Sequence, residues 1–219
     1  MSNTLLSHLA YHGVLSLPLN RPDVLNSLNE TLTMNLLSAL NDARVSKDVR
    51  AIVITGSGRA FCAGADLDSK SWPSPTGLSA GEATAASMDR GFNPLVRAVS
   101  QSTKPVVTAI NGIAAGGGVG LALAGDIAIA CESAKFKLVF GPNLGIIPGM
   151  GASWFLPNLV GRARANGLAM LGDDLPGATE KDWGLIWDCV SEDQLLNEAK
   201  TIAGRLAEGP QIGLKVVVK

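Results

Sequence analysis

The run VVTAINGIAAGGGVGLALAGD at residues 106–126 sets the architecture to be expected of this chain. Its apolar, β-branched start at Val106–Ile110 predicts a buried strand, and three successive glycines at 116–118 open an apolar helix. Residues 51–67, AIVITGSGRAFCAGADL, repeat this plan from a strand through small residues into a turn at Ala63–Leu67. Strand-led segments of this kind indicate an α/β fold.

On both sides of these segments, strands and helices keep alternating. VLSLPL predicts a strand at 14–19, and RAIVIT predicts a strand at 50–55. Leucines at helical spacing predict a helix over 28–45, opened by a capping box of Ser27 and Glu30. Further elements are expected as strands at 126–131 and 136–139, and as helices at 153–171 and 191–208, the last capped by Ser191.

Residues 69–90, SKSWPSPTGLSAGEATAASMDR, break this alternation because they are rich in Ser, Pro, Gly and Ala. Such a composition favours a mobile loop. The loop would either cover a site or be a surface excursion without a role.

The composition of the chain argues against several classes of protein. A formal net charge of −1 gives no electrostatic footprint for a nucleic-acid or anionic-membrane partner. Three widely separated cysteines favour a reducing compartment over a disulfide framework. The N-terminal residues do not resemble a signal peptide, and no run approaches the ~20 apolar residues of a membrane span. We therefore expect a soluble, cytoplasmic protein.

Several kinds of binding and catalytic site are excluded because the sequence lacks the residues that they need. The glycine segments do not complete a dinucleotide fingerprint, because the frames from Gly116 and Gly118 meet Leu121 and Leu123. No P-loop and no nucleophile elbow is present. The two histidines, His8 and His12, precede the first strand and suit neither a metal site nor a catalytic triad. We expect no bound metal.

The remaining possibility is a site formed by backbone N–H groups. Small residues at 63–65 and 116–118 let a ligand approach the main chain closely, and a glycine-opened helix presents unpaired N–H groups. Two such donors converging on one point would stabilise an oxygen that gains negative charge. Close packing of helix on sheet selects the same small residues, so both interpretations stay open at this point.

Four segments resemble the crotonase superfamily, the enoyl-CoA hydratase/isomerase family. They are LNRPDVLNSL at 19–28, RAFCAGADL at 59–67, NGIAAGGGVGLALAGDIAIA at 111–130, and the long segment at 133–172 that contains GIIPGMG. Further segments, FNPLVRAV and WGLIWDCV among them, are similar to a family isomerase that acts on an epoxidised acyl-CoA. The resemblance spans nearly the whole chain.

The resemblance implies a spiral of ββα units over 1–190, with 191–219 starting a C-terminal helical region. Because the apolar run QIGLKVVVK has no cap or polar tail, we expect this region to be incomplete. It implies a homotrimer or hexamer, and an acyl-CoA substrate without a separate cofactor, since coenzyme A is part of the substrate. The N–H groups of Ala65 and Gly117 would form the oxyanion hole. Further substrate-binding positions would be Val24, Leu25, Ala63, Asp66, Leu67, Gly116, Gly141, Leu144 and Gly149, with the Ala63 backbone at the adenine and Val24 and Leu25 along the pantetheine.

The catalytic acids of the family are missing. Family hydratases have glutamates where this chain has Gly120 and Gly141, and a ring-expanding isomerase has an aspartate where it has Gly149. Glycine cannot exchange protons, so hydration by a glutamate pair is not expected. Substitutes to be considered are Asp66, Glu82, Asp89, Asp126 and, as a group that orients water, Asn143.

The resemblance and the missing acids together lead to two alternative hypotheses for the function. In the first, an enolate-stabilising enzyme isomerises or hydrates a bulky unsaturated or epoxidised acyl-CoA, in a pocket that the three glycines enlarge. In the second, the chain is a non-catalytic acyl-CoA binder or an inactive subunit. An RNA-binding role lacks a basic stripe.

Overall fold

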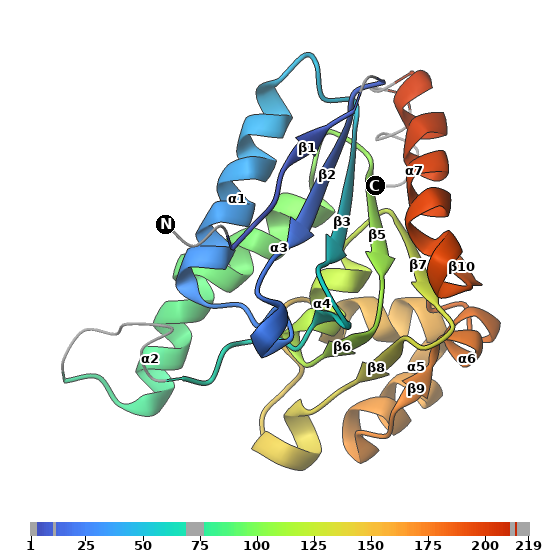
Figure 1. Cartoon of the computed structure of the whole chain (residues 1–219). Coiled ribbons are helices and arrows are strands. Elements are labelled where there is room, and N and C mark those ends of the chain that lie inside the picture. Colours follow the sequence, from blue (N-terminus) through green and yellow to red (C-terminus); the bar gives the residue numbers. More distant parts are fainter. Residues whose placement is uncertain (1–3, 11, 69–76, 211–212, 214–219) are drawn as a thin grey trace.

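The computed structural model describes residues 4–10, 12–68, 77–210 and 213. Ten strands form two sheets within this part of the chain (Figure 1). The larger sheet has the order β1-β2-β3-β5-β7-β10, and the smaller one has the order β4-β6-β8-β9. The strands of the larger sheet are β1 (His8–Leu9), β2 (Val14–Leu19), β3 (Ala51–Gly56), β5 (Val106–Ile110), β7 (Ile127–Cys131) and β10 (Asp188–Val190). Those of the smaller sheet are β4 (Ala60–Cys62), β6 (Ile113–Ala115), β8 (Lys135–Lys137) and β9 (Leu175–Pro176).

The pairing follows one repeated unit. The successive strand pairs β3–β4, β5–β6 and β7–β8 each place their first strand in the larger sheet and their second in the smaller one. Helical structure follows each pair, so the chain winds as a spiral of ββα units. Only β1 and β9 are antiparallel to their neighbours. The central strand β3 is buried along five of its six residues, as an apolar strand of a parallel sheet should be.

The helices pack around these sheets. They are α1 (Glu30–Val45), α2 (Ala80–Ser87), α3 (Asn93–Ser100), α4 (Gly117–Leu123), α5 (Ala152–Leu171), α6 (Gly177–Asp182) and α7 (Glu192–Glu208). A 3-10 turn η1 (Pro22–Val24) and two π-helical turns, η2 (Met88–Phe92) and η3 (Phe140–Leu144), complete the elements. Helix α1 packs on α3 and β2, whereas α7 packs on β2, β3, β5 and β7. Helix α4 lies in the interior of the protein, and all seven of its residues are buried.

Most expected elements are confirmed, with corrections at their ends. The helix expected over 28–45 begins at Glu30, and its cap is Asn29, whose side chain accepts a hydrogen bond from the Leu32 N–H at 2.9 Å. The capping box expected at Ser27 is wrong, because the Ser27 hydroxyl donates to the Val24 carbonyl instead. The strand expected at 136–139 is β8, two residues shorter at its end.

The C-terminal helices also differ in detail. Ser191 is at the N-cap position of α7, but its side chain makes no capping bond and instead donates to Asp193. Within α5 the backbone leaves the helical region at Gly161, where φ is 77° and ψ is 161°. The division of the chain at residue 190 stays a prediction, and the run QIGLKVVVK lies, apart from Gly213, outside the described residues.

The expectation of a mobile loop over 69–90 is wrong for its second half. Residues 69–76 are outside the described part, but Ala80–Ser87 form α2 and Met88–Phe92 form η2. Ser79 and Glu82 make a capping box: the Glu82 N–H donates to the Ser79 hydroxyl at 3.3 Å, and the Ser79 N–H donates to Glu82 Oε2 at 2.8 Å. The Ser-x-x-Glu spacing of this box is visible in the sequence, and it favours the start of a helix although the Ser- and Gly-rich composition favours a loop.

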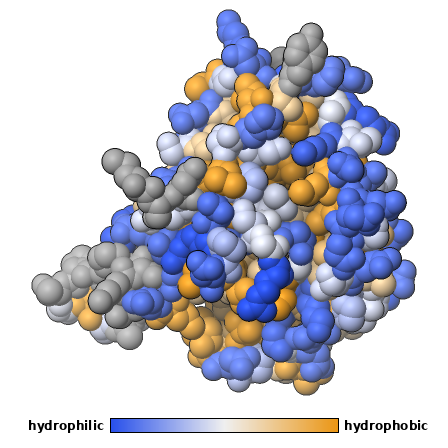
Figure 2. All heavy atoms as spheres, in the orientation of Figure 1, coloured by the Kyte–Doolittle hydropathy of each residue, from blue (hydrophilic) through white to orange (hydrophobic). Residues whose placement is uncertain are grey.

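Within the described residues, no helix is both long and apolar enough to cross a membrane. The same part of the chain contains no group of three or more His, Cys, Asp or Glu side chains placed to hold a metal ion. In the space-filling view, hydrophobic residues gather at the lower edge of the molecule, in the region of η3 (Figure 2). Leu144, Ile146 and Ile147 of this region are 48%, 50% and 82% exposed.

Candidate active site

Backbone hydrogen bonds fix the orientation of Ala65. The Leu28 N–H donates to the Gly64 carbonyl at 2.7 Å, and the Asp66 N–H donates to the Leu28 carbonyl at 3.0 Å. Leu28 and Ala65 thereby form a parallel bridge. Because both groups that flank Ala65 face Leu28, the N–H of Ala65 itself points the other way. It donates no hydrogen bond to any described residue.

Two asparagines hold the loops that carry this bridge. Asn26 is fully buried, and its Nδ2 donates to the carbonyls of Ser57 at 2.9 Å and Ala60 at 2.8 Å. Asn111 accepts from the Gly56 N–H at 3.0 Å and donates to the Gly58 carbonyl at 2.8 Å. Sequence analysis assigned no role to either residue, although both lie in segments that carry the family resemblance.

Gly117 supplies the second donor. It is the first residue of α4, so its N–H has no carbonyl one turn earlier to bond, and no described residue accepts it. Gly116, just before it, has φ 51° and ψ −122°, a conformation open essentially to glycine alone. The Gly116 N–H donates to the Lys137 carbonyl at 2.9 Å, which ties the start of α4 to β8.

The two donor loops touch. A Cβ placed on Gly64 would lie 2.9 Å from the Gly117 nitrogen and 2.8 Å from the Ala115 carbonyl oxygen. Gly64 also has φ +90°, which disfavours any other residue. The glycine at 64 therefore permits the close approach that brings the N–H groups of Ala65 and Gly117 to the wall of one cavity.

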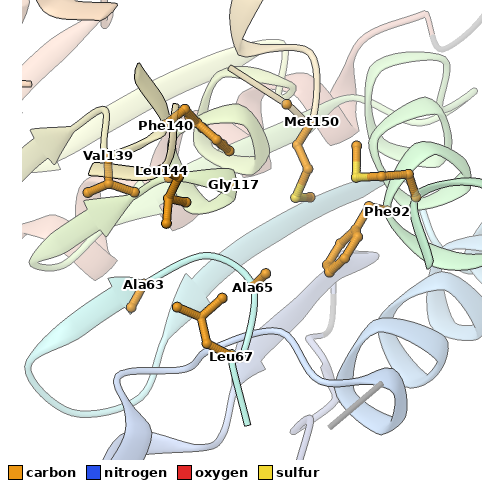
Figure 3. Close-up of a pocket in the computed structure, with 12 residues that line it drawn as sticks. Ala63, Ala65, Leu67, Phe92, Gly117, Val139, Phe140, Leu144 and Met150 are labelled. Atoms are coloured by element: carbon orange, nitrogen blue, oxygen red, sulfur yellow. The ribbon is translucent and has the colours of Figure 1, made fainter. Parts of the chain in front are cut away.

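This cavity has a volume of about 110 Å³ (Figure 3). Its lining residues are Ala63, Ala65, Leu67, Met88, Phe92, Gly116, Gly117, Val139, Phe140, Leu144, Gly149 and Met150. In Figure 3, Met150 and Phe92 lie on one side, and Val139, Phe140 and Leu144 lie on the other. None of these lining residues has an ionisable side chain. The cavity is thus an apolar pocket that the two backbone donors border.

The structure brings together seven of the predicted site residues at this pocket: Ala63, Ala65, Leu67, Gly116, Gly117, Leu144 and Gly149. Val24, Leu25, Asp66 and Gly141 are not among the lining residues. Leu25 is nevertheless adjacent, because its carbonyl accepts the Ala63 N–H at 2.9 Å. Five further lining residues were not predicted, because large apolar side chains ordinarily belong to the core. They are Met88, Phe92, Val139, Phe140 and Met150.

The expectation that three glycines enlarge the pocket is wrong for two of them. A Cβ on Gly120 would lie 2.2 Å from the Met150 carbonyl oxygen, and a Cβ on Gly141 would lie 2.6 Å from the Ala169 carbonyl oxygen. Backbone atoms therefore already occupy the space of both side chains. Only at Gly149 would a Cβ meet ordinary contacts, the nearest being Met88 Cε at 3.4 Å.

The candidate acids have other partners. Asp66 pairs with Arg21 at 2.8 Å and is not among the lining residues of the pocket. Glu82 caps α2, and hydrogen bonds from Ser79 lower the pKa of this exposed carboxyl. Asp126 Oδ2 accepts the Val106 N–H at 2.7 Å, which ties the segment after α4 to the start of β5. Asp89 accepts from Asn93 at 3.3 Å, and neither Asp89 nor Asn143 lines the pocket.

Two buried titratable groups lie outside the pocket lining. Burial raises the pKa of the Cys62 thiol to about 12, so Cys62 is a packing residue and not a nucleophile. Burial also raises the pKa of Glu180 to about 8. Glu180 Oε1 accepts the Phe136 N–H at 3.1 Å, whereas its Oε2 has no hydrogen-bond partner in the described structure.

Known proteins with this sequence pattern act on thioesters of coenzyme A. The sequence profile of the enoyl-CoA hydratase/isomerase family matches residues 10–219. The 1,2-epoxyphenylacetyl-CoA isomerase of Escherichia coli (strain K12) is 43% identical over 217 residues, which are 99% of this chain and 81% of that protein. A probable enoyl-CoA hydratase of Rhodobacter capsulatus is 38% identical over 207 residues, 94% of this chain and 77% of that protein.

Solved structures agree with the sequences. An enoyl-CoA hydratase from Bacillus anthracis superposes with a TM-score of 0.88 at 34% identity, over 98% of this chain and 80% of that one. A monofunctional enoyl-CoA isomerase from M. smegmatis superposes with a TM-score of 0.81 at 28% identity, over 99% of this chain and 90% of that one. These likenesses confirm the α/β, crotonase-like spiral expected from the sequence.

Proposed function

The chain belongs to the enoyl-CoA hydratase/isomerase family, and we propose that it isomerises a bulky epoxidised acyl-CoA whose thioester oxygen is held by the N–H groups of Ala65 and Gly117. The observation that carries this proposal is that Ala65 and Gly117 line one apolar pocket and that neither N–H group has an acceptor among the described residues. A thioester oxygen gains negative charge as an enolate forms. Two fixed donors then bind the transition state more strongly than the substrate.

The pocket favours isomerisation over addition of water. Hydration needs an acid and a base to move protons between water and carbon, and the described lining offers neither. Opening of a strained epoxide, by contrast, draws its driving force from the substrate. The similarity to an epoxyphenylacetyl-CoA isomerase supports this choice of reaction and an acyl group with an aromatic ring.

Coenzyme A enters as part of the substrate, without a separate cofactor. Val24 and Leu25 would follow the pantetheine, since the Leu25 carbonyl binds the Ala63 N–H next to the pocket. Asp66 would act there only through its ion pair with Arg21. We further place the protein in the cytoplasm as a homotrimer or hexamer, without nucleic-acid or membrane partners. Exposed apolar side chains such as Trp154 and Met170, 69% and 74% exposed, support an assembly.

A matched pair of variants tests the oxyanion hole. Gly117→Pro removes the N–H and is compatible with the first position of a helix. Gly117→Ala keeps the N–H and adds the Cβ that would press on Met150 Sδ at 2.6 Å. Loss of one such donor costs about 10²–10³-fold in turnover. We expect Gly117→Pro to fall by that factor below Gly117→Ala on an epoxidised or unsaturated aryl-acyl-CoA. Equal turnover of the two variants would refute the assignment.

A second function has its own support. The absence of any ionisable side chain among the described lining residues also suits a non-catalytic acyl-CoA binder or an inactive subunit. Calorimetry with phenylacetyl-CoA together with a turnover screen separates the two functions. Tight binding of this thioester, with no product from any unsaturated or epoxidised aryl-acyl-CoA, would favour the binder.

A further inference from the structure

We propose that Met150 is the residue that sets the size of the acyl group, by closing the pocket beside the oxyanion hole. This inference rests on the proposed function, since it takes the pocket as the acyl site. Met150 is only 4% exposed and lines the cavity together with Ala65 and Gly117. In Figure 3 its side chain extends from the start of α5 into the pocket.

The Met150 sulfur packs directly on Gly117. A Cβ on Gly117 would lie 2.6 Å from Met150 Sδ and 3.4 Å from Met150 Cγ. The thioether therefore lies beside one of the two donors and borders the space that an acyl group held by that donor would enter. An apolar thioether at this point excludes water without offering a proton.

The backbone of Met150 is held in place, so the position at which its side chain enters the pocket is fixed. Met150 has φ +50°, which is uncommon for a residue with a side chain, and such strain is often found at functional sites. Its carbonyl and Cβ fill the space next to Gly120, at 2.2 and 2.8 Å from a Cβ placed there. Because the main chain is wedged against α4 in this way, only the flexible end of the side chain can adjust to a ligand.

The surroundings of Met150 fit a single aromatic ring. The pocket of about 110 Å³ is somewhat smaller than a cavity of about 150 Å³ that holds benzene. We therefore expect a phenyl group to be accommodated after a small movement of the Met150 side chain, and a fused double ring to bind less well. Met88, Phe92 and Phe140 line the same pocket, and thioethers and aromatic side chains both make favourable contacts with a ring.

The test compares thioesters of two sizes. The dissociation constants of phenylacetyl-CoA and naphthylacetyl-CoA are measured by calorimetry for the wild type, Met150→Ala and Met150→Leu. We expect Met150→Ala to shift the ratio of the two affinities at least 10-fold toward naphthylacetyl-CoA. Met150→Leu, which keeps most of the volume, should shift it less than threefold. Met34→Ala removes a half-buried methionine on α1, outside the pocket lining, and should leave the ratio unchanged.

The outcomes separate the two proposals. An unchanged affinity ratio in a folded Met150→Ala protein overturns the role of Met150, while binding of phenylacetyl-CoA by the wild type leaves the acyl-CoA site intact. Failure of the wild type to bind either thioester refutes the proposed function itself. If Met150→Ala does not fold, Met150→Gly replaces it, since glycine accepts the positive φ, and the same ratio decides.

Discussion

The carbonyl oxygen of Met150 lies where a side chain at Gly120 would begin, 2.2 Å from a Cβ placed on that glycine. This contact joins the segment just before α5 to the middle of α4, and both Met150 and Gly117 of α4 line the pocket. Glycine at 120 therefore reflects backbone packing and not an enlarged pocket. A glutamate at this position would require the segment around Met150 to take another path.

The first prediction concerns this contact. Gly120→Ala should lower the free energy of unfolding by about 1–3 kcal/mol, because the Met150 backbone cannot yield as a flexible side chain does. Gly204→Ala in α7 is the matched control, since nothing lies within 4 Å of its Cβ position. That change should stabilise the helix by up to about 1 kcal/mol. Urea unfolding of both variants measures the difference, and a neutral Gly120→Ala would contradict the packing argument.

Glu180 should make stability depend on pH. Its pKa is near 4.5 in the unfolded chain and is raised to about 8 by burial in the fold. The folded state therefore holds the proton more tightly, and the stabilisation is fully present below pH 4.5 and lost as the pH rises through about 8. The slope cannot exceed about 1.4 kcal/mol per pH unit.

Glu180→Gln isolates this effect. The amide keeps an oxygen for the Phe136 N–H but does not ionise, so the decline between pH 5 and 8 should flatten. Glu208→Gln changes an exposed carboxylate at the end of α7 and should keep the slope of the wild type. Denaturant unfolding at several pH values provides the measurement. The same slope in Glu180→Gln and in the wild type would exclude Glu180 as its source.

The cap of α1 can be tested in the same way. Asn29→Ala should cost about 1 kcal/mol, because the Leu32 N–H loses its acceptor. Ser27→Ala should stay within about 0.5 kcal/mol, since Ser27 bonds an exposed loop carbonyl instead of the helix. If Ser27→Ala proved the more costly change in thermal or denaturant unfolding, the capping box expected from the sequence would be right after all.

Asp66 should prove dispensable for proton transfer. Its carboxylate pairs with Arg21 and does not line the pocket, so Asp66→Asn should keep turnover within about threefold, with a loss of stability because the largely buried Arg21 loses its partner charge. Removal of a general base would instead cost about 10²–10⁴-fold. Steady-state kinetics on the best substrate of the thioester panel decides between these results.

The alternation of strands and helices was predictable because each element follows its local hydrophobic period. The buried run at 51–56 and the glycine-opened helix at 117–123 are examples. The two backbone donors were predictable only through the family resemblance around Ala65 and Gly117. From the residues alone, small side chains fit packing and ligand approach equally well.

The sequence by itself therefore determined the fold and the family, and it predicted the positions of the two proposed donors, because these depend on local patterns and on contiguous motifs. Tertiary structure alone decided what fills the space around them. It placed the Met150 backbone against Gly120, the Met150 sulfur against Gly117, and the carboxylate of Asp66 beside Arg21. The physical reason is that the shape of a cavity depends on how segments far apart in the sequence pack against one another, and a local sequence pattern does not predict that packing.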